Sequence, residues 1–207
     1  MRIIAGTARG RTIDAPRGRE TRPVTDMIRE SLFNIWQFDI EDAEFLDLFA
    51  GSGCMGIEAL SRGARKVVMV DAGAEQVKVI KSNLTKTGLA GRSSEVLKAD
   101  VFDVVGRFER THRTFDIVYV DPPFTEPEIF APMMDALSTG ALLKEGGTIA
   151  IRTAKRMEMP EAIGALQKVR EKRYGASTVH FYAIAQEQPV DVVELEDAAE
   201  ADSDPEA

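Results

Sequence analysis

The chain has 207 residues, of which 44% are hydrophobic, 29% charged and 7% aromatic, which excludes collagen-like, mucin-like and wholly disordered chains and suits one α/β domain. One cysteine excludes a disulfide framework, and with two histidines it supplies too few ligands for a Cys/His zinc site, so we expect no metal. The net charge of −8, taken over the whole chain, argues against a nucleic-acid partner. However, nine of the 34 acidic residues lie in residues 187–207, so the rest of the chain is much less acidic. The chain starts without an apolar stretch and has no run of about 18 apolar residues, so we expect a cytoplasmic protein with no membrane contact.

Residues 1–40 form the first predicted unit, an N-terminal extension whose basic charge suits a polyanion. Six arginines and two acids in residues 1–23 give a local net charge of +4, and planar guanidinium groups suit phosphate. Two short segments are predicted to pair around Gly6 and Gly10 as a hairpin, and Thr25 to begin a helix. The alternative is that this extension only packs on the edge of the domain that follows.

Residues 41–186 form the second unit, in which apolar runs typical of buried strands alternate with helical patterns. Strands are predicted at residues 45–49, 66–70, 94–98, 115–120, 148–152, 167–174 and 178–185. Helices are predicted through Ile57 and Leu60, from Ala74 to Leu84, and after a capping box at residues 125–128. This succession predicts an α/β fold with a doubly wound, mostly parallel sheet. The third unit, residues 187–207, is an acidic tail expected to be disordered.

Ligands of such sheets bind at the carboxyl ends of the strands, where this chain has a glycine-rich turn. In Asp47-Leu-Phe-Ala-Gly-Ser-Gly-Cys-Met-Gly56, Gly51 and Gly53 allow a ligand to approach the backbone closely. Asp71 follows the next strand, 20 residues after Gly51, where a carboxylate can accept both hydroxyls of a ribose. These features fit a nicotinamide dinucleotide or another adenosine-containing cofactor.

Two further features favour the second kind of cofactor. The Asp47 carboxylate would repel a pyrophosphate but can bind the ammonium of a methionine-like tail, directly or through water. In Asp121-Pro-Pro-Phe124, the Asp121 carboxylate and the Pro122 carbonyl can point at one spot, and proline has no N–H, so that spot presents acceptors. The aromatic ring of Phe124 completes a pocket for a planar ring that bears an exocyclic amine.

The motifs of the chain carry a family resemblance over most of residues 1–186. They are Arg2-Ile-Ile-Ala-Gly6, Arg9-Gly-Arg11, Arg22-Pro-Val-Thr-Asp26, Arg29-Glu-Ser-Leu-Phe-Asn-Ile35, Asp47-Leu-Phe-Ala-Gly-Ser-Gly53, Gly56-Ile-Glu-Ala-Leu-Ser-Arg-Gly-Ala64 and Phe115-Asp-Ile-Val-Tyr-Val-Asp-Pro-Pro-Phe124. The last motif and the glycine loop resemble S-adenosylmethionine-dependent amino-methyltransferases. The whole set resembles the RsmD family, which methylates the N2 amine of a guanine in bacterial 16S ribosomal RNA. Two departures are Val24, where threonine is usual, and Cys54-Met55, where small or aliphatic residues are usual.

This resemblance implies a Rossmann-like class I methyltransferase with S-adenosylmethionine as its cofactor. The cofactor-binding residues that it implies are Asp47, Ala50, Gly51, Ser52, Gly53, Asp71, Ala72, Asp100 and Val101. Asp100 would receive the adenine amine, and it can also cap a helix over residues 101–109. The implied catalytic residues are Asp121, Pro122, Pro123 and Phe124. Here Asp121 and the Pro122 carbonyl accept hydrogen bonds from the amine, and Phe124 stacks on the base.

The expected partner is 16S ribosomal RNA, within a small-subunit particle that supplies a structured target, and the chain is expected to act as a monomer. Candidates for contact with RNA phosphates are Arg9, Arg11, Arg22 and Arg29. Arg29 can instead pair with Asp26 or Glu30 on its own helix. Residues 152–173 form a second basic zone of net charge +4, for which a solvated face is the alternative. We expect Cys54, His112 and His180 to be structural.

Three alternative functions stay open. In a nicotinamide-dependent enzyme, the Asp121-Pro-Pro-Phe124 motif would have no role in the reaction. A methyltransferase that acts on DNA or on an amine of another RNA would use the same acceptor motif. A non-catalytic assembly factor that binds ribosomal RNA would not depend on Asp121.

Overall fold

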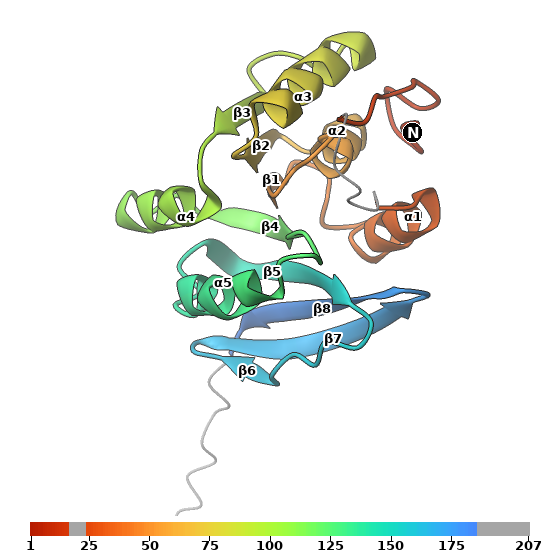
Figure 1. Cartoon of the computed structure of the whole chain (residues 1–207). Helices are drawn as coiled ribbons and strands as arrows, with labels where there is room; N and C mark the ends of the chain where they lie inside the picture. Colours follow the sequence, from red (N-terminus) through yellow and green to blue (C-terminus); the bar gives the residue numbers. More distant parts are fainter. Residues whose placement is uncertain (17–23, 186–207) are drawn as a thin grey trace, which may run out of the picture.

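The computed structural model describes residues 1–16 and 24–185, which are built around an eight-stranded sheet (Figure 1). The strands are β1 (Glu44–Leu48), β2 (Lys66–Asp71), β3 (Ser94–Lys98), β4 (Phe115–Val120), β5 (Leu143–Ala154), β6 (Ala162–Ile163), β7 (Leu166–Tyr174) and β8 (Ser177–Ile184). They lie in the order β3-β2-β1-β4-β5-β8-β7-β6. The first five pair in parallel, whereas β8, β7 and β6 continue the sheet from β5 in antiparallel pairs. The predicted mostly parallel, doubly wound sheet is confirmed.

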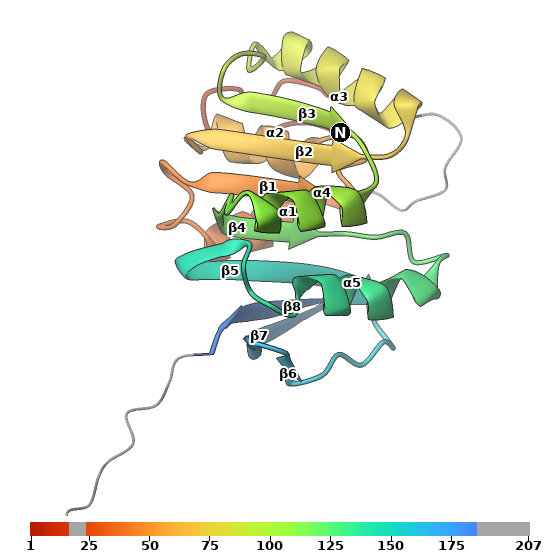
Figure 2. The same cartoon turned by 90° about the vertical axis from the view of Figure 1, so that its left-hand side faces the viewer.

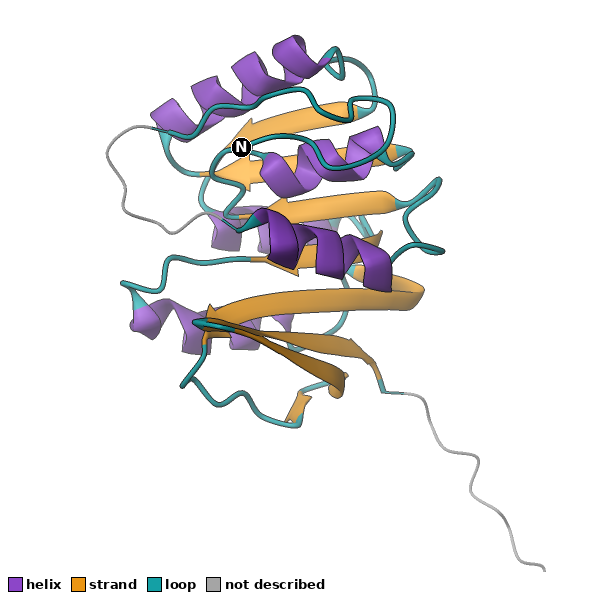
Figure 3. Ribbon diagram, turned by 90° about the vertical axis from the view of Figure 1, so that its right-hand side faces the viewer, coloured by secondary structure: helices purple, strands orange, loops and turns teal. Residues whose placement is uncertain are grey.

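Helices cover both faces of the sheet. They are α1 (Asp26–Ile35), α2 (Cys54–Ser61), α3 (Ala74–Thr87), α4 (Val101–Arg110), the 3-10 turn η1 (Pro127–Ile129) and α5 (Phe130–Leu137). Figure 2 shows α4 and α5 in front of the sheet, and Figure 3, from the opposite side, shows α1 and α2 in front of it. Because side chains alternate along a strand, β1 sends Phe45 to the core with α1 and α2 and sends Leu46 and Leu48 to the core with α4 and α5. These two cores fix the carboxyl ends of the strands relative to one another.

The N-terminal segment (residues 1–16) packs against α2. Its two predicted arms pair through an antiparallel bridge between Arg2 and Thr12, with backbone hydrogen bonds from Ile3 to Arg11 and from Ile13 to Met1, although neither arm is a regular strand. The fully buried carboxylate of Glu58, on α2, accepts hydrogen bonds from the backbone N–H groups of Ile4 (2.8 Å) and Ala5 (3.0 Å). A side chain in place of Gly6 would collide with the carbonyl oxygen of Ser61, since a Cβ would lie 1.7 Å from it. The segment therefore touches α2 through its backbone.

The fully buried side chain of Asn83 ties the same segment to α3 and to the glycine-rich turn. Its Oδ1 accepts from the backbone N–H of Asp14, and its Nδ2 donates to the carbonyls of Asp14 and Ser52, all at 2.9 Å. An amide side chain suits this place because it offers an acceptor and two donors at once. Residues 1–16 and the turn are thereby held in one arrangement.

Helix α1 begins where the sequence predicts it. The Thr25 hydroxyl accepts from the backbone N–H of Ile28 at 3.3 Å, as an N-cap does. Ile28 and Leu32 are buried, and the ring of Trp36 packs edge-on against Phe45 of β1. The apolar face of this helix thus joins the same core as the sheet.

Two details of the predicted elements are wrong. The capping box at residues 125–128 does not form, because a 3-10 turn at η1, with Pro127 first, precedes α5, and no side chain caps either element. Strand β5 begins at Leu143, five residues earlier than predicted, because the glycines at 146 and 147 lie within an irregular stretch of the strand. A Cβ on Gly147 would lie 2.9 Å from the carbonyl oxygen of Lys144, so any larger residue at this position would clash with the backbone. None of the helices in residues 1–16 and 24–185 is long and apolar enough to cross a bilayer.

Candidate active site

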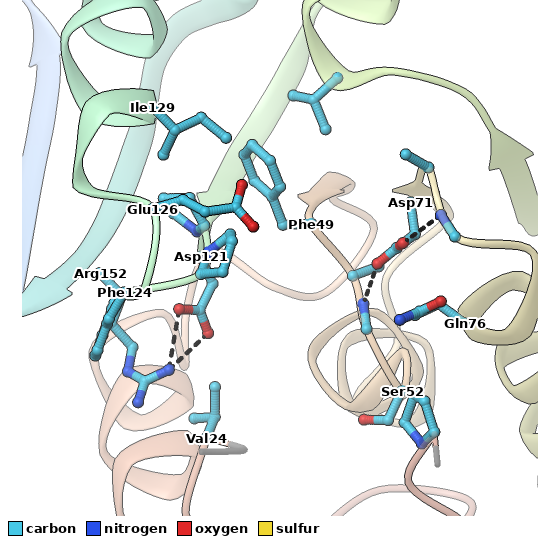
Figure 4. A pocket seen from close by; sticks show the side chains of 18 of the residues that line it. Val24, Phe49, Ser52, Asp71, Gln76, Asp121, Phe124, Glu126, Ile129 and Arg152 are labelled. Atoms are coloured by element: carbon cyan, nitrogen blue, oxygen red, sulfur yellow. Dashed lines mark hydrogen bonds and ion pairs between the residues drawn. The ribbon is translucent and has the colours of Figure 1, made fainter. Parts of the chain in front are cut away.

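A cavity of about 830 Å³ lies where β1, β2, β4 and β5 end, a size typical of cofactor and substrate sites. Figure 4 shows Asp121, Phe124 and Arg152 on one side of it and Asp71 and Gln76 on the other. The predicted site residues that line it are Ala50, Gly51, Ser52, Asp71, Ala72, Asp100, Val101, Asp121, Pro122, Pro123 and Phe124. The cofactor and acceptor motifs predicted separately from the sequence therefore meet in one space.

The turn after β1 brings backbone to the surface of this cavity. Gly51 (φ 57°) and Gly53 (φ 76°) have left-handed backbone conformations that favour glycine. Phe49 adopts the same conformation (φ 64°), which is uncommon for a bulky residue and is a form of strain found at functional sites. A Cβ on Gly53 would meet Ile80 at 3.1 Å, so the turn is also packed tightly against α3.

Asp71 is positioned to accept hydrogen bonds from a ligand. One of its carboxylate oxygens accepts from the N–H of Gly51 (2.9 Å) and the other from the N–H of Gly73 (2.8 Å). Each oxygen of a carboxylate has two acceptor positions, so one on each oxygen stays available. Two acceptors at the cavity surface match the two hydroxyls of a ribose, which fits an adenosine-containing cofactor.

Asp47 lies behind the turn and is not among the residues that line the cavity. It is 1% exposed and accepts from the N–H of Gly56 at 3.0 Å, in the first turn of α2. Burial raises the pKa of its carboxyl to about 8, and the nearby carboxylates of Asp121 and Asp71 add to this rise. Gly53 is likewise outside the cavity lining. Contact of Asp47 with a cofactor ammonium stays a prediction.

Asp100 forms the helix cap that the sequence offered as an alternative. Its Oδ1 accepts from the N–H of Phe102 at 2.8 Å and begins α4. Asp100 is exposed, and together with Val101 and Phe102 it lines the cavity. The cap uses only part of its acceptor capacity, so a contact with an adenine amine remains compatible with it.

At the other end of the cavity, Asp121 is held by Arg152 of β5. Arg152 Nη1 donates to both carboxylate oxygens, at 2.9 and 2.8 Å, and the Tyr119 hydroxyl donates to Oδ2 at 3.2 Å. Burial raises the pKa of Asp121, whereas Arg152 and Tyr119 oppose that rise. The guanidinium carbon of Arg152 lies 4.8 Å from the centre of the Phe124 ring. Within residues 1–16 and 24–185, no group donates a hydrogen bond to the carbonyl of Pro122.

The four predicted RNA-binding arginines differ in their surroundings. Arg9 is exposed, and Arg11 is exposed but donates from Nη1 to the Thr87 carbonyl at 2.6 Å, at the end of α3. Arg22 lies outside the described residues. Arg29 is 0% exposed, so the prediction that it contacts RNA phosphate is wrong. It donates instead to Asp26 of its own helix at 2.9 Å and to the carbonyl of Arg2.

Sequence reasoning missed the contributions of Arg152 and of the N-terminal segment to the cavity. Arg152 follows Ile151, which pairs with Val120, so it lies beside Asp121 on the neighbouring strand. A signal is present in the sequence, since a charge that ends an apolar strand needs a partner, but composition alone places Arg152 in the basic zone of residues 152–173. Met1, Ala15, Pro16 and Val24 also line the cavity. No periodicity in the sequence indicates that they do.

The remaining candidates for special chemistry have ordinary surroundings. Cys54 is 6% exposed and begins α2. His180 is 2% exposed, with Nε2 3.1 Å from the Thr153 hydroxyl and Nδ1 3.3 Å from Glu171. Across the part of the chain that the structure describes, no cluster of three or more His, Cys, Asp or Glu residues could hold a metal ion.

Comparison with known proteins gives consistent results. Ribosomal RNA small subunit methyltransferase D of Escherichia coli strain K12 is 30% identical over 182 residues, or 88% of this chain and 89% of the relative. The protein of the same name from Haemophilus influenzae is 37% identical over 124 residues, or 60% of this chain and 64% of the relative. A hypothetical protein of Thermus thermophilus superimposes with a TM-score of 0.76 at 26% identity, covering 87% of this chain and 98% of that one. The family model described as conserved hypothetical protein 95 matches residues 1–183, and the chain therefore belongs to that family, which confirms its resemblance to the RsmD methyltransferases.

Proposed function

We propose that this chain transfers a methyl group from S-adenosylmethionine to the exocyclic N2 amine of a guanine in 16S ribosomal RNA. The observation that carries the proposal is the single cavity that joins Asp71, with its two open acceptor positions, to the Asp-Pro-Pro-Phe motif. The relatives named as small-subunit ribosomal RNA methyltransferases support the same substrate. Methylation of ribosomal RNA would take place in the cytoplasm. We propose that the RNA is methylated within a small-subunit particle.

The residues of the chain would hold the cofactor along the floor of the cavity. Asp71 accepts from the ribose hydroxyls, Asp100 from the adenine amine, and Val101 and Phe102 supply apolar contact for the base. Gly51 and its neighbours bring backbone close to the methionine end. S-adenosylmethionine, when bound, supplies a methyl group already activated by a positively charged sulfur. The main task of the protein is then to place the amine in line with that methyl group.

Asp121, Pro122 and Phe124 would position the amine. The guanine N2 lone pair is delocalised into the ring, so the amine is a poor nucleophile. Hydrogen bonds from its two N–H groups to the Asp121 carboxylate and the Pro122 carbonyl favour a pyramidal nitrogen and stabilise the positive charge that develops on it. Phe124 stacks on the base and fixes its plane. One amine proton is lost to water after transfer, so Asp121 need not be a strong base.

The RNA would be held by exposed cations outside the cavity lining. Arg9 and Arg11 lie on the N-terminal segment, and Arg11 contacts the C-terminal end of α3. Within the basic zone of residues 152–173, Arg152 belongs to the active site and Lys168 is paired with Glu161. The other cations of this zone are exposed: Lys155, Arg156, Arg170, Lys172 and Arg173. A base must leave its stack to reach the cavity, so we expect an unpaired or flipped nucleotide.

A transfer assay with tritiated S-adenosylmethionine tests the proposal. The substrates are small subunits from cells that lack this protein, naked 16S RNA and duplex DNA, and the product is digested to nucleosides. We expect label in N2-methylguanosine, and the better of the two RNA substrates identifies whether assembly precedes methylation. Label only in DNA adenine would mean that the acceptor motif serves another substrate. No label on any substrate, with cofactor binding intact, would favour the assembly factor.

The variant Asp121→Ala separates catalysis from binding. We expect at least about a 100-fold loss of transfer, the scale of losing one oriented partner of the transition state. The affinity for S-adenosylmethionine should change little, because Asp121 lies at the opposite end of the cavity from Asp71. Near-normal turnover in this variant would reject the role given to Asp121.

A further inference from the structure

Arg152 occupies two of the four acceptor positions of the Asp121 carboxylate, at the amine end of the cavity. The side chains of Arg152 and Asp121 are 6% and 15% exposed, so the ion pair between them is largely shielded from solvent. Oδ2 of Asp121 accepts from both Arg152 Nη1 and the Tyr119 hydroxyl, whereas Oδ1 accepts from Arg152 alone. Because each carboxylate oxygen has two acceptor positions, one position remains, and it is on Oδ1.

Arg152 is itself held in place by a neighbouring strand and by an aromatic ring. Its Nε lies 3.4 Å from the hydroxyl of Ser177 at the start of β8. Its guanidinium group lies over the ring of Phe124, 4.8 Å from the ring centre. One side chain therefore contacts both the residue that would accept from the amine and the residue that would stack on the base.

The surroundings of Asp121 would otherwise favour its protonated form. Asp47 on β1 adds negative charge when ionised. Tyr119 on β4 and Cys54 on α2 are further titratable groups near Asp121, and the carboxyl groups of Glu126, Asp71 and Asp100 lie on the same cavity. Burial raises the pKa of Asp121, and the positive charge that opposes this rise is that of Arg152. A protonated Asp121 would present an O–H donor where an acceptor is needed.

We infer that Arg152 is a positioning residue that keeps Asp121 ionised and turned so that a single open acceptor position, on Oδ1, receives the amine of the base. This inference rests on the proposed function and adds to it a residue outside the Asp-Pro-Pro-Phe motif. A purely structural Arg152 would affect folding without changing the ionisation of Asp121. The two roles are therefore separable by titration.

The first test is a carbon-13 NMR titration of the Asp121 carboxyl in the full chain, with its signal assigned by its loss in Asp121→Asn. Arg152→Met should raise the titration midpoint by about 1–3 pH units, the usual effect of removing an adjacent opposite charge. Arg152→Lys keeps the charge and should restore most of that shift. Arg113→Met is the matched control, because Arg113 also pairs with a carboxylate, Glu95, and also lies over a ring, 4.6 Å from the centre of Phe108. An unchanged midpoint in Arg152→Met overturns the inference.

The second test measures methyl transfer to the RNA substrate as a function of pH. Arg152→Met should lose at least about tenfold in kcat near neutral pH, with its acid limb moved upward by the same interval as the NMR midpoint. Arg152→Lys should keep the wild-type acid limb and still lose kcat, since one ammonium does not hold the carboxylate in the same orientation. Wild-type kcat in Arg152→Lys would overturn the orienting role. If the wild-type chain labels no RNA, the proposed function fails, and the NMR midpoints alone decide whether Arg152 holds Asp121 ionised.

Discussion

Replacing Glu58 by glutamine tests how firmly the N-terminal segment is held to the rest of the domain. The Glu58 carboxylate faces only donors, which are two backbone N–H groups of the segment, Arg62 Nε at 2.8 Å and Arg29 Nε at 3.6 Å. Glutamine has nearly the same shape, but its amide nitrogen would face a donor and its charge is zero. The buried guanidinium of Arg29 would then keep Asp26 as its carboxylate partner.

The structure sets the size of the expected loss. Removing one partner of a buried ion pair costs about 3–5 kcal/mol. Glu58 and Arg29 are both 0% exposed, so water does not compensate for the missing charge. Asp26 remains 2.9 Å from Arg29, which places the expected loss at the lower end, about 3 kcal/mol of the free energy of unfolding. That is a large share of the about 5–15 kcal/mol by which a domain of this kind is stable.

Urea unfolding followed by tryptophan fluorescence measures this loss, because Trp36 is the single tryptophan and lies in the same core. Glu44→Gln is the control, since Glu44 pairs with Arg65, whose side chain is 59% exposed, and such pairs contribute about 0–1 kcal/mol. A loss in Glu58→Gln that is no larger than the loss in Glu44→Gln would refute the reasoning.

Three further predictions follow from the site. In Asp71→Asn, an amide donor replaces a carboxylate acceptor beside the N–H of Gly51 or Gly73. Calorimetry should therefore find a Kd for S-adenosylmethionine at least about tenfold higher, which is about 1.4 kcal/mol of binding free energy. An unchanged Kd would show that Asp71 does not contact the cofactor. The pKa of Asp47, raised from 3.8 to about 8, means that the folded chain binds this proton more tightly, so stability falls as pH rises across that interval. Asp47→Asn should flatten the fall, measured as urea midpoints at about pH 5 and about pH 8, and a wild-type fall in the variant would contradict it. Arg11→Ala should weaken binding to 16S RNA and reduce its salt slope by about 1 in filter-binding titrations, whereas a wild-type slope would exclude a phosphate contact.

The central strands were predictable from the sequence because they are buried on both faces. The apolar runs of β1, β2 and β4 leave little choice of environment, and their predicted bounds differ from the observed ones by one residue at most. The two-residue strand β6 was not predicted, since so short a segment has no periodicity. The start of β5 was hidden because glycines usually mark turns, whereas here Gly147 allows a close approach to Phe115 and Asp116 of the neighbouring strand.

The site was predictable where a residue follows directly from its strand. Asp71 and Asp121 end parallel strands, so topology alone brings them to one edge of the sheet. The sequence predicts an RNA contact for Arg29 and places Arg152 in a basic zone, because a sequence does not reveal which arginines are buried. The structure places both beside carboxylates, at Asp26 and at Asp121.

The position of β8 has a consequence for the order in which the molecule is made. It is the last of the described strands to be synthesised, yet it lies between β5 and β7 in the sheet. Until it emerges, the edge of β5 that carries Arg152 has no neighbour on that side, and the Ser177 hydroxyl is missing. A nascent chain therefore completes its cofactor end, from β1 to β4, well before its amine end. The acceptor site would therefore be the last part of the enzyme to fold as the chain leaves the ribosome.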